Sequence, residues 1–100
     1  NEFRHVYRNG RRFESEWAVV LASPNGLDHG RIGIVISRKL GNAVRRNRMK
    51  RQIREWFRNG GKDRAYDWVV IPRPALSTLE GRAEIDAAFG RLLAPLLNKP

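Results

Sequence analysis

The sequence has no cysteine, few acids and no long apolar run. Without cysteine, its 100 residues form no disulfide framework and no thiolate metal site, so the fold depends on an ordinary hydrophobic core. The longest uninterrupted apolar run extends from Trp17 to Ala22, far short of the roughly 20 residues that a membrane helix needs. Acids number 10 against 20 lysines and arginines, and the resulting net charge of +10 predicts a polyanionic partner.

The length predicts a single domain that spans residues 1–100, with enough hydrophobic residues (41%) for its core. The cytoplasmic location that we expect is permitted by the absence of cysteine, which fits a reducing compartment but does not by itself establish one. The chain starts at Asn1 rather than at methionine, which predicts that a native N-terminal segment has been removed.

The positive charge is concentrated in one segment. Seven cations lie between Arg45 and Arg58 with Glu55 as the only acid among them, and positions 30–54 contain no acid at all. A solvated helix face is the usual explanation of a charge run, but such faces mix both signs to gain ion pairs four residues apart. Because most of the cations are arginines, whose forked guanidinium groups match phosphate oxygens, we expect nucleic acid rather than a lipid surface.

Hydrophobic periodicity and breaker residues predict the element order α-β-β-α-β-α. Helices are expected at 1–9 and 42–58, and a last helix carries apolar residues at helical spacing from 85 to 96. Strands are expected at 13–22, 31–38 and 66–71. Asn1 and Asn42 are suited to cap helix N-termini, and Gly10 is suited to end the first helix in a left-handed conformation. A capping box is expected at Ser77–Glu80, and Pro95 should bend or end the last helix.

Two of these elements have informative faces. In the strand at 31–38, three isoleucines alternate with the small face of Gly33, Val35 and Ser37, which leaves room for another segment. In the helix at 42–58, helical spacing predicts a buried stripe of Met49, Ile53, Trp56 and Phe57. The opposite side gathers polar residues, namely Asn47, Arg48, Arg51, Arg54 and Arg58. Between the two sides, the rim of the stripe holds Arg46 and Lys50.

A long motif runs through the basic helix. It reads Gly41-Asn42-Ala43-Val44, then Arg46-Asn47-Arg48, Lys50-Arg51 and Arg54-Glu55. Shorter motifs flank it, namely Glu2-Phe3 with Val6-Tyr7 and Gly10, Gly33 with Ser37-Arg38-Lys39, and Tyr66-Asp67-Trp68-Val69-Val70-Ile71-Pro72-Arg73. Together these segments resemble the bacterial ribonuclease P protein subunit over essentially the whole chain, and every position of that family's central signature is filled.

The resemblance implies a fold, and it implies separate roles for the protein and its RNA. The fold is an α/β (α+β two-layer) sandwich with a central mixed sheet and room for an extra short strand, in which the signature helix crosses between two parallel strands in the rare left-handed sense. Sequence alone favours the common right-handed crossover. In the family, a catalytic RNA with its magnesium ions cleaves the 5′ leader from precursor tRNA, and the protein, expected to be monomeric apart from the RNA, binds that RNA and the leader.

The resemblance also implies two sets of binding residues. The catalytic RNA is expected to contact Arg46, Asn47, Arg48, Lys50, Arg51 and Arg54. The single-stranded leader is expected in a cleft formed by Phe3, Tyr7, Ser37, Arg38 and Lys39. Core packing is the alternative role for Phe3 and Tyr7, which share a helix face with Val6. No residue of the protein is expected to be catalytic or to bind a metal ion, and no membrane contact is expected.

Three other functions fit parts of the sequence. A ribosomal-type structural RNA-binding protein is the main alternative, because it would be equally basic. A helix-turn-helix DNA-binding protein is disfavoured, since strands flank the basic helix. A free-standing protein nuclease would need clustered carboxylates or a general base. The ten acids are scattered, and His5 and His29 are interpreted as surface histidines without evident partners.

Overall fold

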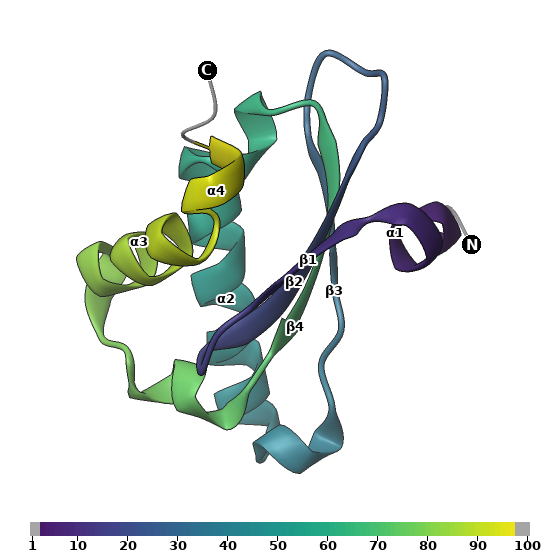
Figure 1. Ribbon diagram of the computed structural model, residues 1–100. Coiled ribbons are helices and arrows are strands. Elements are labelled where there is room, and N and C mark those ends of the chain that lie inside the picture. Colours follow the sequence, from purple (N-terminus) through teal and green to yellow (C-terminus); the bar gives the residue numbers. More distant parts are fainter. Residues whose placement is uncertain (1–2, 98–100) are drawn as a thin grey trace.

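A computed structural model describes residues 3–97 and shows a four-stranded sheet with helices on both faces (Figure 1). The strands lie in the spatial order β1 (Arg11–Glu14), β2 (Ala18–Pro24), β4 (Tyr66–Pro72) and β3 (Arg31–Ile34). The α-helices are α1 (Arg4–Asn9), α2 (Ala43–Asn59), α3 (Gly81–Leu92) and α4 (Ala94–Leu97). Short 3-10 turns follow β3, α2 and β4, namely η1 (Arg38–Leu40), η2 (Gly61–Asp63) and η3 (Pro74–Thr78).

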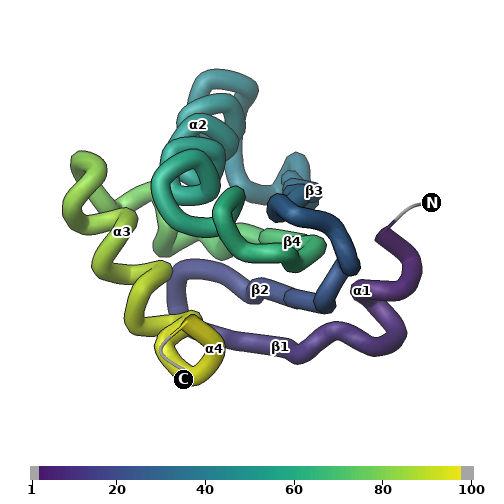
Figure 2. Tube along the Cα trace, turned by 90° about the horizontal axis from the view of Figure 1, so that it is seen from above, coloured from purple at the N-terminus to yellow at the C-terminus, as the bar shows by residue number. Residues whose placement is uncertain are grey.

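The sheet is mixed, and its one crossover is left-handed. β1, β2 and β4 are antiparallel neighbours, whereas β3 runs parallel to β4 with Ile32 opposite Trp68. α2 connects β3 to β4 across one face of the sheet. Seen from above in Figure 2, this path turns counter-clockwise as β3 and β4 recede, which is the left-handed sense. The fold implied by the family resemblance is therefore confirmed, and the right-handed crossover favoured by sequence alone is wrong.

The strand predicted at 13–22 is in fact two strands joined by a tight turn. β1 ends at Glu14 and β2 begins at Ala18. The hydroxyl of Ser15 makes the turn, since it accepts hydrogen bonds from the amides of Trp17 and Ala18 at 3.1 and 3.3 Å. A serine that binds the amides two and three residues ahead favours a turn over continued strand pairing. The strand predicted at 31–38 is also shorter, because β3 ends at Ile34.

Three residues were predicted to start or end the first two helices, and the outcomes differ among them. Asn42 caps α2 as expected, because its side-chain oxygen accepts a hydrogen bond from the amide of Arg45 at 2.9 Å. Gly10 does end α1, but its φ is −71° with ψ at 149°, so the predicted left-handed conformation is wrong and the chain continues extended into β1. The predicted cap at Asn1 lies outside the described residues.

The last helix starts later than the predicted capping box would place it. The segment Ser77–Glu80 forms no capping box, because its two hydroxyls donate to carbonyls within η3 and Glu80 makes no side-chain cap. Gly81 begins α3 with φ at +76°, a conformation that glycine adopts without steric cost. α3 ends at Leu92, before Pro95, so the expected interruption of the helix is confirmed.

The main core lies between α2, α3 and one face of the sheet. Met49, Ile53 and Trp56 are buried under α2, while Phe57 is half-buried. The indole of Trp56 meets Trp68 of β4 edge-on at 5.4 Å and stacks on Phe89 of α3 at 4.8 Å, so one residue joins three elements.

The sequence analysis missed one buried residue on the side of α2 that faces the core. Gln52 is buried beside the stripe, and its amide nitrogen donates to the carbonyl of Leu79 at 3.1 Å. A glutamine can occupy such a place because this hydrogen bond satisfies part of its polar group. The bond also links α2 to the segment that precedes α3.

A smaller core lies on the opposite face, under α1. Val6 is fully buried against Val19 and Leu21 of β2 and Val69 of β4. Phe3 rests on the small face of β3, since a Cβ atom at Gly33 would lie 3.5 Å from its ring. The segment expected to lie on that small face is therefore α1.

We predict that Ile53→Ala lowers the free energy of unfolding by about 2–5 kcal/mol, because it leaves a cavity at a fully buried position. Urea denaturation followed by circular dichroism measures this change. Val44→Ala, at a 78% exposed position of the same helix, is the matched control and should change stability by less than about 0.5 kcal/mol. Equal effects of the two substitutions would contradict the packing described here.

Candidate nucleic-acid interface

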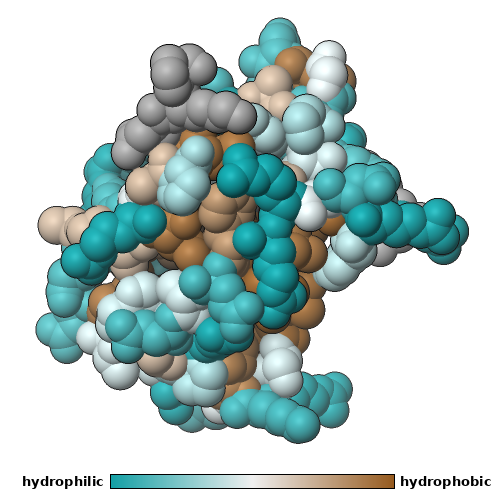
Figure 3. All heavy atoms as spheres, viewed as in Figure 1, coloured by the Kyte–Doolittle hydropathy of each residue, from teal (hydrophilic) through white to brown (hydrophobic). Residues whose placement is uncertain are grey.

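α2 carries the predicted RNA-binding residues away from the core. Its inner side is occupied by the buried stripe, so helix geometry directs the remaining side chains outward or along the rim. The exposed residues are Asn47, Arg48, Arg51, Arg54 and Arg58, and the half-buried rim residues are Arg46 and Lys50. This division is the one that the sequence predicted. On the face shown in Figure 3, hydrophilic side chains form ridges around hydrophobic atoms that stay visible between them.

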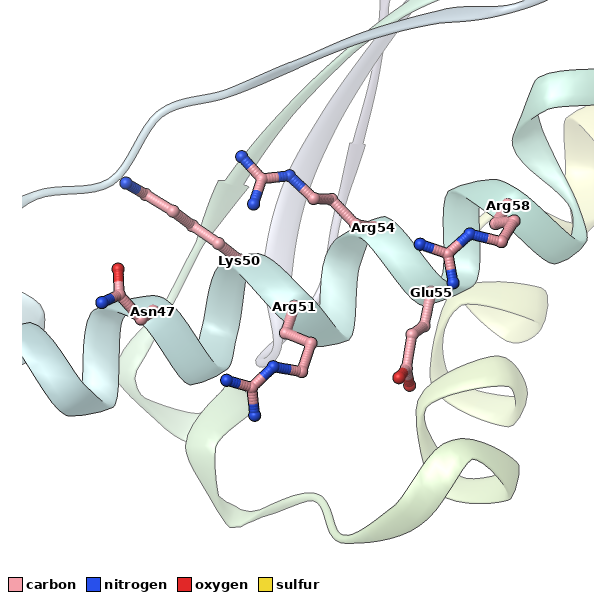
Figure 4. Close-up of a pocket in the computed structure, with 6 residues that line it drawn as sticks. All are labelled: Asn47, Lys50, Arg51, Arg54, Glu55 and Arg58. Carbon is pink, nitrogen blue, oxygen red and sulfur yellow. The ribbon is translucent and has the colours of Figure 1, made fainter.

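Long polar side chains of α2 surround a shallow hollow of about 560 Å³. It is lined by Asn47, Lys50, Arg51, Arg54, Glu55 and Arg58. Figure 4 shows Lys50 and Arg54 extending to one side of the helix, and Arg51 and Glu55 to another. Because a single helix supplies every lining residue, the hollow is a space between side chains rather than a cleft between elements. A surface of this kind suits an extended polyanion, whereas small molecules bind in enclosed, mostly apolar pockets.

The cations of α2 have no acidic partners. Within the described chain, 3–97, none of the seven forms an ion pair, although Glu55 is in the same helix. Arg45 donates to the hydroxyl of Ser77 at 2.6 Å, and the Nε of Arg46 lies 3.4 Å from the carbonyl of Asn42. The pairing expected of an ordinary solvated face is thus missing, and the like charges repel one another until an anion binds.

The residues of the predicted leader cleft come from two places, α1 on the other face of the sheet and the segment that follows β3. Tyr7 is 52% exposed and Phe3 is half-buried on α1, while Ser37, Arg38 and Lys39 are exposed where the chain leaves β3. Ser37 is four residues beyond Gly33, on which Phe3 rests, and an even spacing along an extended chain keeps one face. Ser37 is therefore expected on the same face as Phe3, roughly 13 Å farther along the chain, whereas Arg38 and Lys39 belong to η1, where this alternation no longer applies.

A buried carboxylate that the sequence analysis did not single out joins α1 to the sheet. Asp67 of β4 is fully buried and accepts hydrogen bonds from Nε and Nη2 of Arg31 at 2.8 and 2.7 Å, and from Asn25 at 3.1 Å. It also lies 3.0 Å from Nε2 of His5 on α1. The hydrogen bonds from Arg31 hold the pKa of Asp67 below its usual value against the opposing effect of burial, with a smaller contribution from Asn25.

The cluster around Asp67 also contacts Phe3, one of the predicted leader-binding residues. The Cζ atom of Arg31 lies 5.9 Å from the centroid of the Phe3 ring, so Asp67 fixes the guanidinium against which Phe3 packs. His5 was expected to have no partner, and that expectation is wrong. The sequence signal for the cluster was an acid inside an otherwise apolar strand, since a buried carboxylate requires partners.

The ribonuclease P family profile matches residues 1–96 of this sequence. The chain belongs to the ribonuclease P protein family. It is therefore the protein component of the tRNA-processing ribonucleoprotein, and part of an RNA endonuclease. This membership selects the ribonuclease P interpretation over the ribosomal-type alternative.

Individual ribonuclease P proteins are similar over nearly the whole chain. The ribonuclease P protein component of Thermotoga petrophila is 42% identical over 94 residues, covering 92% of this chain and 80% of that protein. The Chromobacterium violaceum component is 42% identical over 99 residues, covering 96% and 80%. Among solved structures, the Staphylococcus aureus RNase P protein superposes with a TM-score of 0.81 at 33% identity (98% and 92% covered). The Thermotoga maritima protein gives 0.73 at 36% identity (97% and 89% covered).

Two further findings concern what this ribonuclease P protein could hold. Residues 3–97 contain no group of three or more histidine, aspartate or glutamate side chains placed to bind one metal ion. The cluster of Asp67, Arg31, Asn25 and His5 includes only two such side chains, Asp67 and His5, and Asp67 is already bound by Arg31. In the same part of the chain, no helix is long and apolar enough to cross a membrane.

We predict that Asp67→Asn lowers the free energy of unfolding at pH 7 by about 1.5–3 kcal/mol, the usual worth of hydrogen bonds to a charged group. Because the folded-state pKa of Asp67 is lowered, its contribution is present above the unfolded pKa of about 3.9 and is lost as the pH falls through the folded value. Urea unfolding from pH 7 to pH 2 should therefore show a steeper loss below about pH 4 for the unmodified protein than for Asp67→Asn. The exposed Asp63→Asn is the control, and a gap between Asp67→Asn and the unmodified protein that stays constant with pH would contradict this assignment.

Proposed function

We propose that this protein binds the catalytic RNA of ribonuclease P through the outer face of α2 and the 5′ leader of precursor tRNA through the α1 face of the sheet. In this way it promotes endonucleolytic removal of the leader. The proposal depends mainly on α2. This helix carries seven cations, none of which forms an ion pair with any residue from 3 to 97, and the chain belongs to this family.

The proposed contacts to the catalytic RNA are electrostatic and bidentate. Arg48, Arg51 and Arg54 are exposed and form no ion pair with any other residue of the described chain, 3–97, so their guanidinium groups are available to phosphate oxygens. Asn47 adds a neutral side chain that both donates and accepts hydrogen bonds. Arg46 and Lys50 extend the surface toward the sheet, and RNA bound there releases counterions, which supplies much of the affinity.

The proposed leader site combines an aromatic side and a cationic side. We place the single strand between Tyr7 and Phe3 on one side and the exposed Arg38 and Lys39, which follow β3, on the other. Stacking of bases on aromatic rings tolerates any sequence, which suits leaders that differ between precursor tRNAs. The distance of roughly 13 Å along the chain from Gly33, under Phe3, to Ser37 corresponds to a few nucleotides of extended strand rather than to one.

The chemistry is proposed to belong to the RNA. The described residues offer neither a metal-binding group of three side chains nor a nucleophile with a base, so the magnesium ions are assigned to the catalytic RNA. The protein supplies binding and orientation as a monomer apart from the RNA, without a membrane partner and in the cytoplasm.

We predict that the double variant Arg48→Gln and Arg51→Gln weakens binding to a bacterial ribonuclease P RNA. It should also reduce the slope of log Kd against log salt by about 1.4–1.8, since each lost phosphate contact removes roughly 0.7–0.9. Filter binding at several salt concentrations measures both effects. The matched control is Arg82→Gln with Arg91→Gln, which removes the same charge from exposed positions of α3. If both double variants change the slope equally, the effect is net charge alone and the assignment to α2 is wrong.

We predict that the unmodified protein restores cleavage of a leader-bearing precursor tRNA by a bacterial ribonuclease P RNA at low magnesium. Tyr7→Ala should weaken binding of that substrate about 5- to 150-fold, because it removes a stacking platform worth about 1–3 kcal/mol. The measurement is the cleavage rate as a function of substrate concentration, with a leaderless competitor alongside.

Tyr7→Phe, which keeps the ring, is the control and should behave like the unmodified protein. Failure to restore cleavage despite tight RNA binding would overturn the proposed function. Restored cleavage with no change of preference between the two substrates in Tyr7→Ala would overturn only the leader site.

A further inference from the structure

A second hollow, distinct from the one along the outer face of α2, lies beside the free edge of the sheet. It measures about 470 Å³ and is lined by Ile32, Arg54, Phe57, Arg58 and Lys62. Three separate elements supply these residues, namely β3, α2 and η2. Unlike the space between the cations of α2, this hollow is therefore built by the tertiary structure.

Its floor is apolar and firmly supported. Ile32 and Phe57 are half-buried and pack against the main core. Gly61 lies close to the Phe57 ring, since an added Cβ atom there would lie 3.0 Å from ring atom Cδ1. A partly exposed aromatic ring packed on the core is a preformed stacking surface, since little side-chain entropy is lost when a ligand binds. β3 is also an edge strand, so one side of its backbone faces away from the sheet.

Its rim is cationic. Arg54, Arg58 and Lys62 are exposed, and none of them forms an ion pair with any residue from 3 to 97. Two acids are sequence neighbours of these cations, Glu55 and Asp63, and neither lines the hollow. An apolar, aromatic floor under three cations matches the two parts of a nucleotide, the base and the phosphate.

We propose that this hollow binds one unpaired nucleotide of the catalytic RNA, with the base stacked on Phe57 and Ile32 and the phosphate held by Arg58 and Lys62. The proposal rests on the proposed function, because Arg54 and Arg58 line both this hollow and the outer face of α2. One RNA strand running along α2 thus reaches the hollow without leaving the protein. The leader is not the proposed occupant, since the α1 face lies on the other side of the sheet (Figure 1).

The test compares Phe57→Leu with Phe57→Tyr in binding to a bacterial ribonuclease P RNA. Leucine keeps an apolar side chain on the core but removes the ring, so the Kd should rise about 5- to 150-fold with an unchanged salt slope. Tyrosine keeps the ring and should retain the affinity. The urea midpoint of each variant shows whether it is folded. Similar Kd values for folded Phe57→Leu and the unmodified protein would overturn the proposal.

The rim is tested with a matched pair of charge variants. Lys62→Gln should weaken RNA binding and lower the salt slope by roughly 0.7–0.9, whereas Arg64→Gln, an exposed cation outside the hollow, should do neither. If the double variant of Arg48 and Arg51 weakens binding but Phe57→Leu and Lys62→Gln do not, the subsite is wrong and the proposed function stands. If none of these variants weakens binding, the proposed function itself fails.

Discussion

The packing of α2 on the sheet is the interaction on which the rest of the structure depends. Seven cations on one helix repel one another, and nothing within the helix compensates them, so the helix is stable here because its apolar stripe is buried. Trp56 provides the central contact, edge-on to Trp68 and stacked on Phe89. Because that stripe is narrow, most of the circumference of α2 is left for charged side chains. The core thus fixes the position of a surface that would otherwise favour an unfolded chain.

The two faces of the sheet serve different purposes. One is covered by α2, α3 and α4 and forms a conventional core, whereas the other is covered, within residues 3–97, by the six residues of α1 and by Phe3 beside them (Figures 1 and 2). So short a helix cannot be held by Val6 alone, and the buried carboxylate of Asp67 adds a polar attachment through His5 and Arg31. A buried carboxylate is costly unless its hydrogen bonds are satisfied, and here three side chains satisfy it. On this face of the sheet, α1 is therefore firmly attached, while part of the surface beside it stays exposed.

Several features of the fold followed from local chemistry and were predictable. The cap at Asn42 was one, because an asparagine before an amphipathic run has a single favourable role. The turn at Ser15 was not, since a continuous apolar run from Trp17 suggested a longer strand and the competing hydroxyl gave only a weak signal. At Gly10, the local preference was clear but the tertiary structure overrode it. It can adopt a left-handed conformation, but the pairing of β1 with β2 required it to be extended.

The sequence by itself determined the family, the charged face of α2 and the order of the elements apart from the division of the strand at 13–22, because motif, periodicity and charge are all local properties of the chain. It also indicated a small face with room for another segment around Gly33, but only the structure shows that Phe3 lies there. Only the tertiary structure decided which distant residues meet. Asp67 and Arg31 are 36 residues apart and lie in different strands, and no spacing rule brings them together. The hollow of Ile32, Phe57 and Lys62 likewise exists only because a left-handed crossover brings the end of α2 beside β3.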